Sequence, residues 1–142
     1  MVKLIFGSIV IWQFDFIWYL IPFWLIAVLI RYFTNVIIGS MAFWINDRAN
    51  SSAVTEGIYM FMGVMAGEII PLNIMFNGNL EFLAFNPFAW SLHLPMQVYL
   101  GKFNHLQVGL VILGGVVWSF VLYLFAKIVF NIGLKKNESV GL

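Results

Sequence analysis

Residues 66–102 constrain this chain most, because they are rich in apolar and aromatic side chains but cannot form one continuous helix. Pro71, Pro87 and Pro95 each lack a backbone donor, and each ring clashes with the preceding helical turn. Residues 77–79 (Asn-Gly-Asn) add a turn signal. We therefore predict a broken region at one membrane face, in which short helices dip into the interface and return. Irregular backbone at such depth must be covered by protein or reached by water.

The composition indicates an integral membrane protein with no soluble domain. Of 142 residues, 63% are hydrophobic and 9% are charged, whereas a soluble domain is roughly 25% charged. The net charge of +1 gives no case for nucleic-acid binding, which requires clustered Lys and Arg. The chain has no cysteine, which excludes disulfides, iron–sulfur clusters and thiol catalysis.

The hydropathy pattern predicts an all-α, polytopic membrane protein with three or four spans. One span needs ~20 apolar residues, and residues 4–45 are almost continuously apolar, which is too long for one span. We place the break at Gln13, Asp15 and Pro22; a single long tilted helix after an interfacial N-terminal segment is the alternative. The predicted elements are spans at 4–20 (complete or partial), 23–45, 53–70 and 106–132, a broken region at 71–105 and a tail at 133–142.

The basic residues predict an orientation in the membrane. Four of them fall on one side, joined by Lys3 if the first span is complete, whereas Lys102 falls on the other. Because cytoplasmic loops are enriched in Lys and Arg, we predict a multi-pass protein of the cytoplasmic membrane with a cytoplasmic C-terminus. The broken region is then external. The four residues are Arg48, Lys127, Lys135 and Lys136.

Arg31, Asn35 and Glu68 are candidates for lining a substrate path. A charge in the middle of a span is costly, so Arg31 should face protein or water, and Asn35 lies one turn further on the same face. The competing interpretation for Arg31 is a structural pairing with Asp15 or Glu56. For Glu68 the alternatives are the outer mouth of a path or the cap of an adjacent short helix.

Other residues predict packing but no catalysis. Gly63 and Gly67 form a G-x-x-x-G spacing, which lets a neighbouring helix approach closely. His93 and His105 have no further ligands at metal spacing. Ser91, near His93, has no nucleophile elbow or orienting acid, and the chain contains no phosphate-binding glycine loop. We therefore predict no metal site, no cofactor and no enzymatic activity.

Several short strings occur in an order that resembles a known family. These strings place Phe43 and Trp44 at a span end, Pro71 after the next span, Pro87, Pro95 and Gly101 in the broken region, Trp118 in the last span, and residues 133–136 (Gly-Leu-Lys-Lys) in the tail. Across residues 39–142 this order resembles the C-terminal half of type-2 ABC exporter permeases, the bacterial group related to the daunorubicin and viologen exporters, and the residues just named are the family-motif positions.

The resemblance implies a permease of about six spans that works as a dimer bound to two ATP-hydrolysing subunits. Residues 23–45, 53–70 and 106–132 would be its fourth, fifth and sixth spans, and 4–20 all or part of the third. The family's first two spans and its coupling helix have no counterpart here, so we expect a fragment, a split gene product or a degenerate copy.

The function expected from the resemblance is export of an unknown amphipathic substrate. The partners expected are an ATP-binding cassette ATPase, a second permease subunit (a homo- or heterodimer) and the lipid membrane. The alternative is a non-transporting membrane scaffold or accessory subunit that packs through its G-x-x-x-G face.

Overall fold

The computed structural model describes residues 14–44, 48–75, 83 and 85–138, and the elements in this part of the chain are all helical. The predicted all-α membrane class is thus confirmed. The longer helices are α2 (Phe14–Ser40), α3 (Arg48–Ala66) and α7 (His105–Glu138), and the short elements are η1 (Met41–Phe43), α4 (Leu72–Met75), η2 (Pro87–Trp90) and α6 (His93–Tyr99).

Helix α2 runs through Pro22 without interruption, so the predicted break between spans at 4–20 and 23–45 is wrong at this position. Pro22 removes one backbone donor, but proline is tolerated in membrane helices when the surroundings accommodate the freed backbone group. The neighbouring Phe23 is 1% exposed and packs in the core. The long-helix alternative describes residues 14–40, and residues 1–13 lie outside the described part.

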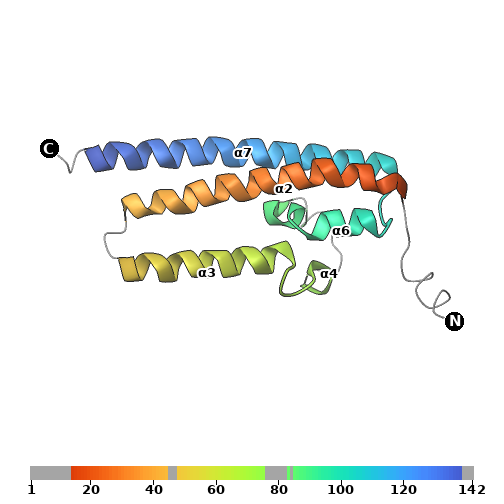
Figure 1. Ribbon diagram of the computed structural model, residues 1–142, viewed down its shortest axis with the longest axis horizontal. Coiled ribbons are helices and arrows are strands. Elements are labelled where there is room, and N and C mark those ends of the chain that lie inside the picture. The colour runs from red at the N-terminus through yellow and green to blue at the C-terminus, as the bar shows by residue number, and fades with distance from the viewer. Residues whose placement is uncertain (1–13, 45–47, 76–82, 84, 139–142) are drawn as a thin grey trace.

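Helices α2 and α7 lie side by side and run in the same direction (Figure 1). Three contacts fix this alignment at successive levels. Near the helix starts, the Tyr19 hydroxyl lies 3.1 Å from Nδ1 of His105. In the middle, the Phe33 and Tyr123 rings are 5.4 Å apart, and at the far end Phe43 and Phe130 are 6.0 Å apart.

Two helices in the described part are long and apolar enough to cross a bilayer, over Trp18–Phe43 and His105–Lys136. They correspond to the spans predicted at 23–45 and 106–132, whereas α3, which covers most of the span predicted at 53–70, is not one of the two. Much of their apolar surface is uncovered by the chain itself, as for Trp18, Trp24 and Leu106, each more than two-thirds exposed. Such large exposed side chains on a long apolar helix fit a lipid surrounding.

Helix α3 ends at Ala66, before the predicted end of its span at residue 70. Gly67 follows with φ +83°. The N–H of Glu68 donates to the Gly63 carbonyl at 2.9 Å, and that of Gly67 to the Val64 carbonyl at 3.1 Å, which is the Schellman termination of a helix. An added Cβ at Gly63 would meet only Glu68 and Ile69 within 4 Å. In this chain the G-x-x-x-G residues therefore end α3, and the predicted packing of another helix on Gly63 is not what the structure shows.

The region after α3 is broken into short elements, as its prolines predict. Pro71 precedes α4, Pro87 begins η2 and Pro95 lies in the first turn of α6, where a missing backbone N–H is least costly. The elements η2 and α6 lie between α3 and the α2–α7 pair, whereas α4 lies beyond the end of α3 (Figure 1). They bring most of the buried side chains to the first halves of α2 and α7: Ile26, Ile30, Leu72, Ala89, Trp90, Leu94, Val98 and Val108.

Trp90 is the centre of this core. Its side chain is 3% exposed, and its indole Nε1 donates to the Val111 carbonyl of α7 at 2.8 Å. The ring fits against α7 because Gly115 has no side chain: an added Cβ there would lie 2.7 Å from Trp90 Nε1 and from Ile26 Cγ2. The close approach of η2, α2 and α7 therefore depends on this glycine.

Candidate functional site

Two polar pairs connect α2 with the α3 segment, and we call their four residues the polar seam. Nη2 of Arg31 donates to Oε1 of Glu68 at 3.2 Å. One turn further along α2, Oδ1 of Asn35 accepts from the Tyr59 hydroxyl at 3.1 Å. The three residues predicted as path candidates thus come together, with Tyr59 as a fourth member that the sequence reasoning did not single out.

The polar seam lies at the middle of α2, since Arg31 is central in the span Trp18–Phe43. Glu68 follows the end of α3, and its contact with Arg31 shows that α3 ends level with the middle of α2. The predicted partners of Arg31 were Asp15 and Glu56. The structure pairs it with Glu68, and the Asp15 side chain lies outside the described part.

The ion pair of the polar seam remains accessible, with side chains 61% (Arg31) and 40% (Glu68) exposed. In water such a pair contributes ~0–1 kcal/mol. At the middle of a membrane span, however, charged groups are stable only when they face protein or a water-filled space. The chain itself therefore leaves one side of this mid-span ion pair uncovered.

Asn86 ties the broken region to the end of α3. Its side-chain Nδ2 donates to the Met65 carbonyl at 2.6 Å, and its Oδ1 accepts from the backbone N–H of Phe88 at 3.1 Å. The residue is 2% exposed. One amide thus satisfies a carbonyl near the end of α3 and also caps η2. It therefore holds η2 beside α3. The Asn-Pro string at 86–87 was visible in the sequence, but its partner Met65 was not.

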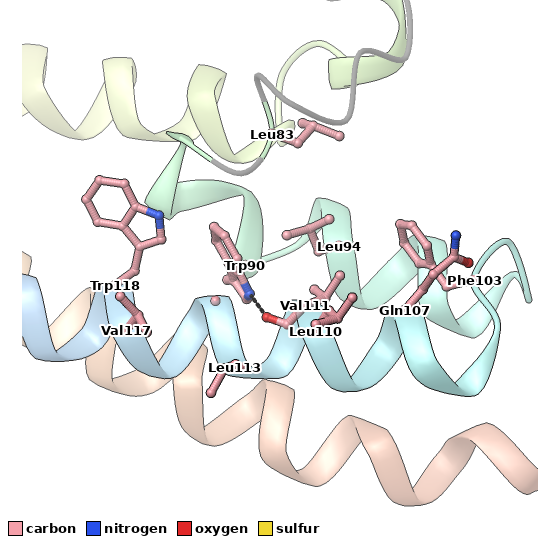
Figure 2. A pocket seen from close by; sticks show the side chains of 11 residues that line it. Leu83, Trp90, Leu94, Phe103, Gln107, Leu110, Val111, Leu113, Val117 and Trp118 are labelled. Carbon is pink, nitrogen blue, oxygen red and sulfur yellow. Dashed lines mark hydrogen bonds between the residues drawn. The ribbon is translucent and has the colours of Figure 1, made fainter.

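A groove of about 520 Å³ lies between α7 and the broken region (Figure 2). Figure 2 shows Trp90 near its middle, Gln107 and Phe103 toward one end, and Val117 and Trp118 at the other. Its walls are almost entirely apolar. The lining residues are Leu83, Trp90, Leu94, Phe103, Gln107, Leu110, Val111, Leu113, Gly114, Val117 and Trp118.

His93 is buried in α6 at 7% exposure, and its Nε2 has no hydrogen-bond partner among the described residues. Burial lowers its pKa, and the positive charge of Lys102 lowers it further. His93 is therefore neutral at pH 7. It packs beside the turn at Gly67, where an added Cβ would lie 3.7 Å from the His93 Cβ.

The family-motif aromatics hold the far ends of α2 and α7 together. The Phe43 ring packs directly on Gly133, where a Cβ would overlap it. Lys136 places its Nζ 6.0 Å from the ring centroid of Trp44, within the range of a cation–π contact. Gly101, another motif position, directly follows the cap of α6 with φ +68°.

The comparisons with known proteins identify a family. A family model described as ABC-2 family transporter protein matches residues 2–141. Comparison with curated proteins and with solved structures gives no match. The matched range covers nearly the entire chain, so the polar seam and the groove both lie within it. The chain therefore belongs to the ABC-2 family of transporter proteins and is a membrane component with a permease-type transport role, not itself catalytic.

Proposed function

We propose that this chain forms the path-lining part of an ABC exporter permease that moves an amphipathic substrate across the cytoplasmic membrane. A separate ATP-binding cassette subunit supplies the energy, and a second permease subunit, identical or different, completes the path. Membership of the ABC-2 family supports the transport role. The exposed ion pair of Arg31 and Glu68 at mid-span is the observation that carries the assignment.

A charged side chain in the hydrocarbon of a bilayer is costly. Lipid tails cannot solvate the accessible parts of Arg31 and Glu68, whereas water in a path or a facing polar subunit can. The second pair, Asn35 with Tyr59, extends the same surface by one turn along α2. The polar headgroup of an amphipathic substrate loses hydrogen bonds to water as it enters the membrane. Hydrogen-bonding groups at successive levels of a span can replace these bonds.

We also propose a multi-pass arrangement with a cytoplasmic C-terminus and an external broken region, which membership of the ABC-2 family supports. This orientation follows from Lys135 and Lys136 beyond the apolar part of α7, by the positive-inside bias. Because the chain has no native cysteine, single cysteines at residues 85–105 can be tested with impermeant reagents. Labelling from the cytoplasmic side alone would contradict the orientation.

The deciding experiment measures transport by the complete complex with Arg31→Ala. We expect transport to fall at least ten-fold while membrane insertion and subunit assembly stay at wild-type level. A charge-exchanged protein carrying both Arg31→Glu and Glu68→Arg separates a path role from mere pairing. If the pair is only structural, the exchange restores transport; if it lines the path, transport stays impaired although the ion pair is restored. Unchanged transport by Arg31→Ala would refute the assignment.

The non-transporting scaffold remains the other hypothesis, and it depended on a G-x-x-x-G packing face. The left-handed backbone of Gly67 at the end of α3 weighs against such a face. Purification from mild detergent distinguishes the two hypotheses. Recovery of an ATPase and a second permease supports the exporter, and a homo-oligomer without an ATPase supports the scaffold.

A further inference from the structure

We infer that the groove between α7 and the broken region binds one acyl chain of a membrane phospholipid, with the phosphate beside Lys102. The groove has a volume of about 520 Å³, within the ~300–1,000 Å³ typical of ligand sites. It shares no residue with the polar seam. Lipid binding here is therefore separate from the proposed transport path, and its test does not depend on transport.

The length of the groove matches one leaflet. Its lining on α7 extends from Gln107 to Trp118, which is ~16 Å at ~1.5 Å per residue. Half of a hydrocarbon core of ~30 Å is ~15 Å. Because α7 spans the membrane from His105, the groove begins at the headgroup level and ends near the bilayer centre.

The chemistry of the groove also changes along its length in the way an acyl chain requires. Val111, Gly114 and Trp118 make its inner part apolar, and the one polar group near its middle, the Trp90 N–H, already donates to the Val111 carbonyl. Polar side chains lie at the end near the start of α7, where Gln107 lines the groove and Lys102 is exposed. A basic side chain at headgroup level attracts the phosphate of a lipid.

The position of the groove favours a lipid as its occupant. Its outer rim consists of Leu110, Leu113 and Val117, which are 60%, 60% and 54% exposed. These side chains belong to the apolar surface that a membrane-spanning helix presents to lipid. An acyl chain can enter directly from the bilayer. The apolar walls then replace its contacts with other acyl chains without burying an unpaired polar atom.

The experiment uses the full chain in phospholipid nanodiscs, with a trace of phosphatidylcholine that carries a photoreactive diazirine on one acyl chain. We expect crosslinks on Trp90 and Leu94, each 3% exposed, which a lipid on the outer surface cannot reach. A diazirine near the chain terminus should label near Trp118, and one near the ester should label near Gln107. Crosslinks confined to outward-facing α7 residues, or absent from the groove, would overturn the inference.

Matched variants test the fit of the acyl chain. Leu110→Trp fills the groove and should reduce labelling of Trp90 at least five-fold, whereas Leu124→Trp, on the same helix but outside the groove, should leave it unchanged. Equal labelling in both variants would contradict a defined groove. If a single cysteine at Leu110 instead crosslinks to a second copy of the chain, the groove is a subunit interface and the inference is wrong.

The headgroup contact has its own test. With a photoreactive phosphatidylglycerol in place of the phosphatidylcholine, Lys102→Gln should lower the labelling of Trp90 about five-fold, the expected effect of one basic residue near an anionic lipid surface. Lys127→Gln, near the other end of α7, serves as the control. Labelling that is unchanged in Lys102→Gln would refute the placement of the phosphate.

Discussion

Gly115→Ala is the sharpest test of how the broken region packs on the long helices. The added Cβ would lie 2.7 Å from Ile26 Cγ2 and from both Cδ1 and Nε1 of Trp90. Neither neighbour is the end of a flexible side chain, since Ile26 is β-branched and Trp90 is held by its hydrogen bond to the Val111 carbonyl. Overpacking costs ~1–3 kcal/mol, and a weakened hydrogen bond adds ~0.5–1.5 kcal/mol.

We therefore expect Gly115→Ala to lower the free energy of unfolding by about 2–4 kcal/mol. Since ~1.4 kcal/mol is a ten-fold change, the unfolding equilibrium shifts by one to three orders of magnitude. The assay is a denaturant titration in mixed micelles, followed by circular dichroism. Gly109→Ala is the matched control, because no atom lies within 4 Å of a Cβ there; it should stabilise α7 by ~0.5–1 kcal/mol.

Two results would refute this reasoning. The first is equal stability of the Gly115→Ala and Gly109→Ala proteins. The second is the absence of coupling in a double-mutant cycle between Gly115→Ala and Ile26→Ala, which removes the clashing Cγ2. If the steric account is right, the two substitutions are less destabilising together than the sum of their separate effects.

The remaining predictions concern the turn after α3 and the buried histidine. Gly67→Ala should cost ~1–2 kcal/mol, because φ +83° is left-handed; Gly57→Ala, with no atom within 4 Å of a Cβ, should not destabilise, and the same titration compares them. His93, whose pKa burial lowers, binds fewer protons in the folded chain than in the unfolded one below about pH 6.5. Stability should therefore fall as the pH decreases through that window down to the folded pKa, and His93→Gln should remove this dependence in titrations at several pH values.

Where the chain breaks was predictable from sequence, because proline acts locally. Pro71, Pro87 and Pro95 each lie at or near the start of a short element, since a missing donor is tolerated there whatever the surroundings. Pro22 shows the limit of the same rule. It lies inside α2. A helix accommodates such a proline through its surroundings and the packing of the neighbouring residues, and a rule that considers only the local sequence does not include these.

Three residues of the candidate site were predictable from the sequence, but the pairs that they form were not. A charge at Arg31 in an apolar span signals a special environment by itself. Its partner, however, depends on where α3 stops, and that is decided by the left-handed turn at Gly67. The sequence pattern gave Gly67 a packing role, and only the backbone geometry shows that it ends the helix and places Glu68 beside Arg31.

The groove was not predictable, because its walls come from segments with no shared sequence signal. Trp90 was one aromatic among many, and nothing in its neighbourhood indicates that its indole reaches Val111 of a later helix. A glycine pair at 114–115 in an apolar span is common in membrane helices. The pair matters here because both glycines lie directly opposite Trp90.

The parallel pairing of α2 with α7 has a consequence for how the protein is made. The contacts that bury Trp90 come from Ile26 and from α7, which follows the other described helices along the chain. Until α7 has inserted, η2 and α6 can contact α2, and η2 can also contact α3, but the Trp90 indole lacks the Val111 carbonyl and the surface at Gly115. Membrane helices insert before they associate. For an interval, the broken region of this protein therefore lacks its packing against α7. A chain interrupted within the first half of α7 therefore lacks the surface that completes the packing of Trp90.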